Sequence, residues 1–250
     1  MKMTRVLVGL AAASVLLMAQ PKVKSKAEAE AIQAIQNAAD VDSRLKAIED
    51  MLTKFADTEF KPVLLQMATS LVQQKGDYEQ TIIWGERTLE ADPKNYTAMV
   101  MLANTIAQRT REHDLDREDK LGRAEKYAKG AMDLLQTAQK PRPDITDEQW
   151  IAAKSDLNAQ AHQALGFAAM ARKKFDVAIT EFGLAATMAN PPDPATYVRL
   201  ADAQTQGGKF DDALATIEKV LVMPDLNAQV KQVAENVKAN AARLKAAKKQ

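Results

Sequence analysis

The sequence predicts an all-α protein, an α-α superhelix (solenoid) of stacked helix hairpins with a C-terminal capping helix. Two observations support this prediction. The apolar 46% of the chain is mostly Ala, Leu, Val and Met, and only 5% of residues are aromatic; this balance favours helices over strands. In addition, segments 162–185 and 197–220 repeat the same order of large, small and turn residues, which is typical of repeat architectures.

Charge and cysteine content exclude several classes of function. The 34 basic and 33 acidic residues nearly cancel, so no global field would attract nucleic acid or an anionic membrane. The chain has no Cys, which excludes disulfides, thiolate metal sites and a lipid on an N-terminal Cys. We therefore expect neither a nucleic-acid partner nor a cofactor.

The N-terminus has the pattern of a secretory signal peptide. Lys2 and Arg5 precede an uncharged apolar run, 6–19, which is shorter than the ~20 residues that a membrane span needs. We predict cleavage after Ala19, with cleavage after Ala27 as the alternative; an uncleaved signal anchor or an ordinary first helix are the competing interpretations. Because an exported chain without disulfides suits a bacterial periplasm, we expect export to that compartment, without stable membrane insertion after signal removal.

The clearest repeat lies near the C-terminus. In both segments a large residue is followed by Leu and a small residue, then by a turn, an aromatic residue and Ala. Ala178 and Ala213 occupy this last position and are 35 residues apart. These residues resemble the tetratricopeptide family, whose 34-residue unit forms a helix pair. Pro191 and Pro224 lie near the exits that this family's pattern places after each unit.

The resemblance weakens towards the N-terminus. It is closest over 159–224, partial over 62–135, and limited to Ala47 before residue 58. Gly76-Asp77-Tyr78 matches the turn of an upstream unit, where Thr81 and Gly85 replace the usual Ala and aromatic residue. The predicted organisation is a signal peptide at 1–19, degenerate repeats at 20–135, a Pro-containing loop at 136–146, repeats at 147–224, and a capping helix with a basic tail at 225–250.

Small residues at fixed positions give the pattern its physical meaning. We expect them to let the two helices of a pair approach closely, while Leu fills the seam and neighbouring pairs bury each other's apolar faces. The small residues are Ala103, Gly166 and Ala201 on first helices and Ala124, Ala178 and Ala213 on second helices; the seam residues are Leu102, Leu165 and Leu200.

Three further segments interrupt or end the array. An insertion at 112–120 separates two helices, and Thr146 to Gln149 has the spacing of a capping box that opens a long helix. The final helix closes the array with one apolar face and one basic face. Its expected apolar residues are Leu226, Val230, Val233, Val237 and Leu244.

The family resemblance implies a partner-binding groove lined by first helices. The residues that it places there are Gln66, Ser70, Gln73, Gln74, Asn104, Gln108, Gln160, Gln163, Phe167, Met170, Arg199, Asp202 and Gln206. Their amides suit an extended backbone, while Phe167 and Met170 suit apolar side chains. Carboxylate capture is not favoured because only Asn104 and Arg199 are of the right type. The alternative is that these are ordinary solvated helix faces.

The other candidate residues favour structural roles. His162 occupies a bulky repeat position and is expected to pack. The Asp114-x-Asp116-x-Glu118 run lacks the Gly of a calcium loop, so we predict a mixed-charge linker and no metal site. Gly207-Gly208-Lys209 is expected to be a turn rather than a phosphate cradle. Trp84 and Trp150 are expected to pack.

The sequence therefore favours a periplasmic scaffold that binds a protein or peptide segment in the groove. A structural envelope protein that binds cell-wall polymer or self-associates is the alternative. An enzyme using Asp114, Asp116 or Asp144 is disfavoured, because no catalytic spacing is present. The partner and the oligomeric state stay open at this point.

Overall fold

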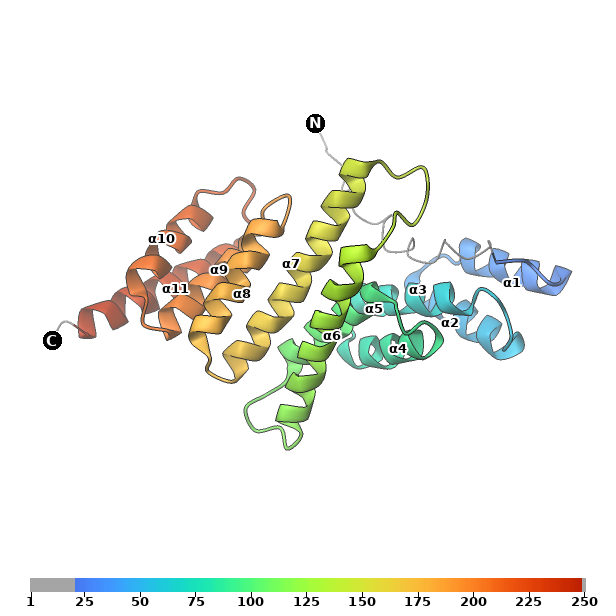
Figure 1. Cartoon of the computed structure of the whole chain (residues 1–250), viewed down its shortest axis with the longest axis horizontal. Helices are drawn as coiled ribbons and strands as arrows, with labels where there is room; N and C mark the ends of the chain where they lie inside the picture. Colours follow the sequence, from blue (N-terminus) through green and yellow to red (C-terminus); the bar gives the residue numbers. More distant parts are fainter. Residues whose placement is uncertain (1–20, 249–250) are drawn as a thin grey trace.

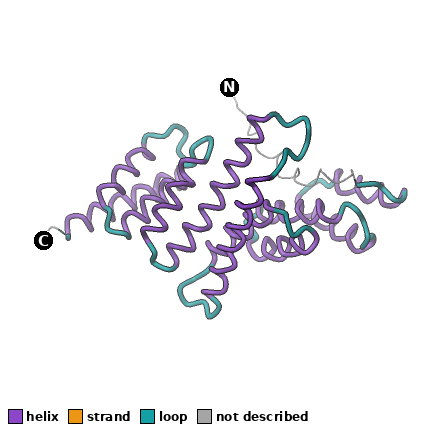
Figure 2. The backbone as a smooth tube through the Cα atoms, viewed as in Figure 1, coloured by secondary structure: helices purple, strands orange, loops and turns teal. Residues whose placement is uncertain are grey.

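The computed structural model describes residues 21–248, which form eleven α-helices and no strand (Figure 1, Figure 2). The helices are α1 (Lys26–Asn37), α2 (Val41–Lys54), α3 (Lys61–Gln74), α4 (Tyr78–Ala91), α5 (Tyr96–Arg109), α6 (Arg117–Thr137), α7 (Asp147–Ala171), α8 (Phe175–Met188), α9 (Pro194–Gln206), α10 (Phe210–Leu221) and α11 (Ala228–Ala247). Successive helices pack as antiparallel pairs in one elongated row, and α11 closes the C-terminal end. The predicted all-α solenoid is confirmed.

Side-chain caps explain where many of these helices begin. An Ncap oxygen that accepts a backbone N–H satisfies one of the free donors of the first turn. The capping box that opens α7 is confirmed: Thr146 Oγ1 accepts from Gln149 N at 3.2 Å, and Gln149 Oε1 accepts from Thr146 N at 3.0 Å. Other helices start at Ser25, Asp40, Asp77, Asn95, Asp193 and Asn227, whose side chains all accept such bonds.

Small buried residues hold the helix pairs together. Five of the predicted contact positions have no exposed surface, namely Ala103, Ala124, Ala178, Ala201 and Ala213. At the sixth, Gly166, an added Cβ would lie 2.7 Å from the ring of Phe182, a separation that normal packing does not allow. The close approach expected from the repeat is therefore present where α7 packs against α8.

Two boundaries differ from the sequence-based expectation. Residues 117–120, assigned to the insertion, form the first turn of α6, because Glu118 and Asp119 there stabilise the helix N-terminus. On α11, Val233 is 45% exposed, whereas Ala234 and Ala241 are fully buried. The small Ala side chains let α11 approach α9 and α10 closely, which rotates Val233 outwards.

The N-terminal end of the array depends on a buried carboxylate. Glu28 is 1% exposed, and it accepts hydrogen bonds from Thr58 Oγ1 at 2.6 Å and from Lys24 N at 2.5 Å. These contacts join α1 to the loop between α2 and α3. No helix within residues 21–248 combines the length and apolarity needed to cross a membrane. The predicted signal peptide, 1–19, lies outside the described residues.

We expect Glu28→Gln to destabilise the protein in a pH-dependent way. The hydrogen bond from Thr58, followed by that from Lys24 N–H, holds the pKa of Glu28 below its ordinary value of 4.5. Because the folded-state pKa is the lower one, this stabilisation is complete above the unfolded-state pKa and is lost as pH falls through the folded-state pKa. The difference in thermal midpoint between wild type and variant should be large at neutral pH and shrink in acid. A pH-independent difference would contradict this assignment.

Candidate functional site

The predicted groove residues lie on α3, α5, α7 and α9, the first helices of four successive pairs, and they differ in exposure. Gln73, Gln74, Gln108, Gln160 and Gln206 are exposed; Gln163, Phe167, Met170, Arg199 and Asp202 are partly buried; Gln66, Ser70 and Asn104 are buried. The three buried side chains take part in helix packing, so the accessible residues of this set concentrate on α7 and α9.

Gln66 belongs to a buried amide bridge between two helix pairs. Its Oε1 accepts a hydrogen bond from Asn95 Nδ2 at 2.9 Å, and Asn95 Oδ1 caps α5 by accepting from Ala98 N at 3.0 Å. Ser70 donates its hydroxyl to the carbonyl of Gln66 at 3.1 Å. Sequence patterns place these residues on first helices, but they do not show that Gln66 is buried where α3 meets the N-cap of α5.

Replacement of Asn95 by Ala should lower the free energy of unfolding by about 1–3 kcal/mol, because it removes the cap of α5 and one hydrogen bond of the buried Gln66 amide. Urea denaturation measures the change. Asn227→Ala is the matched control, since Asn227 caps α11 by the same kind of bond, 2.8 Å from Gln229 N, but is exposed. Equal losses in the two variants would contradict a special contribution from the buried bridge.

Asn104 joins α5 to α7. Its Nδ2 donates to the backbone carbonyls of Val100, at 3.1 Å, and of Gln160, at 2.8 Å. Its Oδ1 is buried without a hydrogen-bond partner. Asn104 lies on a first helix, as predicted. Its amide, however, bonds the neighbouring repeat through the carbonyl of Gln160.

The partly buried residues of α7 and α9, together with the exposed Gln206, form one surface, which we call the α7/α9 surface: Gln163, Phe167, Met170, Arg199, Asp202 and Gln206. Two contacts join the helices here. Gln163 Nε2 donates to Thr196 Oγ1 at 2.5 Å, and the Arg199 guanidinium lies 5.2 Å from the centroid of the Phe167 ring. Helical spacing places the three α7 residues on one face of α7 and the three α9 residues on one face of α9. The two contacts show that these faces meet.

The two charged groups of this surface are partly removed from water. Burial lowers the pKa of the Arg199 guanidinium, an effect that the carboxylate of Asp193, at 3.7 Å, opposes. Burial likewise raises the pKa of the Asp202 carboxyl, opposed by the hydrogen bond that Gln206 Nε2 donates at 2.9 Å.

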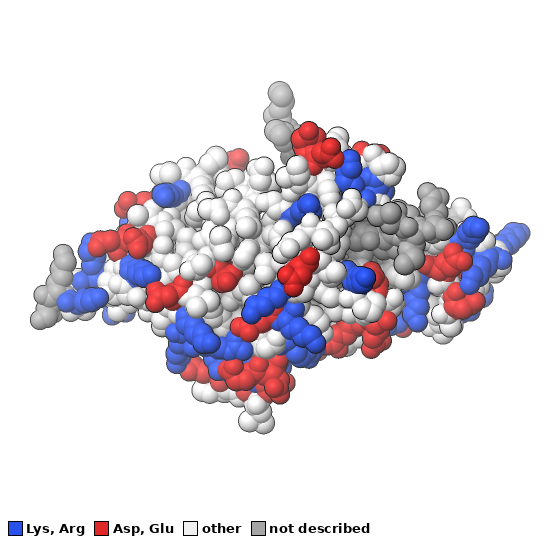
Figure 3. All heavy atoms as spheres, in the orientation of Figure 1, with Lys and Arg blue, Asp and Glu red and all other residues white. Residues whose placement is uncertain are grey.

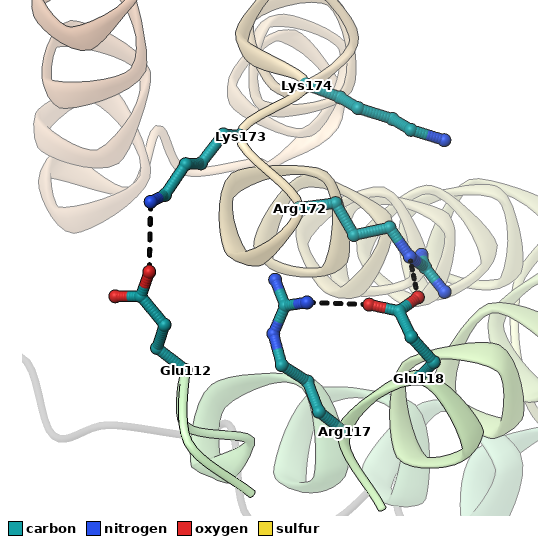
Figure 4. Close-up of a pocket in the computed structure, with 6 residues that line it drawn as sticks. All are labelled: Glu112, Arg117, Glu118, Arg172, Lys173 and Lys174. Carbon is teal, nitrogen blue, oxygen red and sulfur yellow. Dashed lines mark hydrogen bonds and ion pairs between the residues drawn. The ribbon is translucent and has the colours of Figure 1, made fainter.

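A second site, which we call the edge pocket, lies where the turn between α7 and α8 meets the start of α6 (Figure 4). Its volume is about 630 Å³. Its lining residues are Glu112, Arg117, Glu118, Arg172, Lys173 and Lys174. Figure 3 shows charged groups of both signs gathered along this edge of the molecule. Sequence analysis missed the pocket, because its residues come from two segments that lie far apart along the chain.

Ion pairs within the edge pocket connect the insertion to the α7–α8 turn. Arg172 bonds Glu118 at 2.7 Å and Glu125 at 2.5 Å, and Lys173 bonds Glu112 at 2.9 Å. The backbone of Lys173 has a φ of 58°, an uncommon conformation for a residue other than Gly. Since these carboxylates already hold cations of the same chain, the pocket acts as a connection between repeats.

The acidic side chains of the Asp114-x-Asp116-x-Glu118 run are engaged in the same way. Asp114 and Asp116 both pair with Lys120, at 3.0 and 2.9 Å. Within residues 21–248, no three side chains of the metal-binding types are grouped closely enough to hold an ion. Asp114 and Asp116 precede α6, whereas Glu118 lies in its first turn, so the predicted linker ends earlier than expected.

The remaining predicted structural residues lie where packing places them. His162 is partly buried, and its Nδ1 lies 2.7 Å from Glu181 Oε2; this acidic partner on α8 has no signal in the sequence. Trp84 and Trp150 are buried. Gly208 forms the turn between α9 and α10 with a φ of 74°, which favours a residue without a Cβ. The packing and turn predictions are confirmed.

Comparison with solved structures identifies the architecture. A thermophilic TPR protein from Thermus thermophilus superposes with a TM-score of 0.55 at 17% identity, covering 84% of this chain and 98% of its own. A tetratricopeptide repeat protein from Parabacteroides merdae has a TM-score of 0.45 at 16% identity, covering 88% and 91%. The fold is a tetratricopeptide-type superhelix. No family model and no curated protein sequence matches the chain, so the superhelix establishes architecture and not function.

Proposed function

We propose that this protein is a scaffold that binds an extended segment of a partner protein along the α7/α9 surface. The contact between Arg199 and Phe167 carries the proposal, because it joins two repeats into one surface that has apolar groups on α7 beside hydrogen-bonding groups on α9. An extended peptide offers both kinds of group, apolar side chains and a hydrogen-bonding backbone. Amides such as Gln163 and Gln206 both donate and accept, which suits a peptide backbone.

Photocrosslinking tests this proposal. Benzoylphenylalanine introduced at the exposed positions Gln160 and Gln206 should capture one dominant protein in the native cell. The matched control positions are Gln80 on α4 and Gln229 on α11, which are also exposed but lie away from the surface. Capture from the first two positions alone supports the proposal. Capture from neither, or equally from all four, contradicts it.

We further propose that the scaffold acts in the bacterial periplasm. The basis is the signal-peptide pattern of residues 1–19 together with the absence of Cys throughout the chain. Mass spectrometry of the protein isolated from its host should give a mature N-terminus at Gln20 or Glu28. An intact Met1 in the soluble fraction would contradict export.

A further inference from the structure

Asp202 is a partly buried carboxylate whose structural contacts do not balance its charge. Among the described residues, its hydrogen-bond partner is the neutral side chain of Gln206, at 2.9 Å, and no Lys or Arg lies within ion-pair distance. The nearest cation along α9 is Arg199, one turn away. Arg199 instead lies over the Phe167 ring and pairs with Asp193 at 3.7 Å. These two contacts hold the guanidinium near Asp193 and Phe167.

The charge of this region is consequently unbalanced. Asp193, Arg199 and Asp202 together carry one negative charge when ionised. Of the cations at the nearby turns, Lys209 pairs with Asp176 at 2.8 Å and Lys173 pairs with Glu112 at 2.9 Å. Lys174 lies near Gly207, at the end of α9, but it forms no ion pair with Asp202. A carboxylate that is partly removed from water and has no cation beside it raises the free energy of the protein without its partner. A cation supplied from outside the chain would reverse that penalty.

The α7 side of this surface limits the shape of that cation. Phe167 and Met170 pack against the cluster that contains Ala203 of α9, and Arg199, one turn before Asp202, lies over the Phe167 ring. A long aliphatic stem that ends in a charge matches an apolar surface bordered by a carboxylate, because the stem remains buried while the charged end reaches Asp202.

We propose that the partner segment carries a lysine or arginine that pairs with Asp202, its aliphatic stem lying against Met170 and Phe167. The inference rests on the proposed function, because it names the chemistry of the segment that the α7/α9 surface holds. It predicts a basic residue as the selective feature of the segment and an apolar or amide-bearing context around it. An acidic segment is disfavoured, because it would place like charge against Asp202.

A randomised dodecapeptide library, selected on the immobilised purified protein and sequenced, tests the inference. The pool bound by wild type should be enriched in Lys or Arg at one position. Asp202→Asn should lose this enrichment. Asp212→Asn should keep it, since Asp212 is exposed on α10, outside the surface. Circular dichroism confirms that both variants are folded.

A single selected peptide provides a second measurement that does not depend on protein variants. Changing its basic residue to norleucine should weaken binding to wild type roughly tenfold or more, because a charge-assisted hydrogen bond is lost. A pool with a clear consensus that lacks a basic position overturns the inference and leaves the proposed function standing. A pool with no enrichment over blank resin contradicts the proposed function itself.

Discussion

Phe182→Ala is expected to lower the free energy of unfolding by about 3–5 kcal/mol, which is typical for truncation of a buried aromatic residue. Phe182 is 1% exposed and is the largest of the fully buried side chains in the described part of the chain. It packs edge-to-face on Phe167, with ring centroids 5.3 Å apart. Since Gly166 and Phe167 contact its ring from α7, truncation opens a cavity between the two helices and removes support from the α7/α9 surface.

Equilibrium urea unfolding, followed by far-ultraviolet circular dichroism, measures the effect of Phe182→Ala. Leu184→Ala is the matched control on the same helix, because Leu184 is 38% exposed; its expected loss is below about 1 kcal/mol. Similar losses for the two variants would show that the α7–α8 seam contributes little to stability.

Gly166→Ala should destabilise the protein by about 1–3 kcal/mol, although Ala is the better helix former. An added Cβ would lie 2.7 Å from Phe182 Cδ1 and Cε1, and a ring buried on all sides has no free direction in which to move. Helix propensity and packing therefore oppose each other here, and packing has the larger magnitude.

Gly183→Ala separates the effect of helix propensity from the effect of packing. No atom from a neighbouring helix lies within 4 Å of the Cβ position at Gly183, so propensity alone acts there, and we expect stabilisation of up to about 1 kcal/mol. Combining Gly166→Ala with Phe182→Leu should recover part of the loss, because the smaller side chain yields space. Additive losses in a double-mutant cycle would show that the two residues are not coupled.

Much of the architecture follows from local sequence features. Ala178 and Ala213, 35 positions apart, mark the second helices of two hairpins, because only small side chains allow the close helix approach that each pair requires. Thr146 and Gln149 set the start of α7 through bonds between residues three positions apart. Such features depend on neighbouring residues, so sequence spacing is sufficient to predict them.

The candidate site was predictable only in part. The repeat pattern indicates that Phe167, Met170, Arg199 and Asp202 lie on first helices. It gives no measure of burial, so Gln66 appears equivalent to them although it is 1% exposed. The difference arises because Gln66 meets Asn95, at the start of α5, in a buried hydrogen bond between residues 29 positions apart.

For the C-terminal repeats, the sequence by itself determined the helices, their pairing and the seams of small residues, since these depend on short-range periodicity and on a repeat of 35 residues between Ala178 and Ala213. The tertiary structure alone decided which side chains from distant positions meet: Glu118 with Arg172, Glu181 with His162, and Arg199 with Phe167. It also decided that Asp202 loses water without gaining a cation. The physical reason is that desolvation and pairing depend on the distances between groups in space. The spacing of residues along the chain does not give these distances.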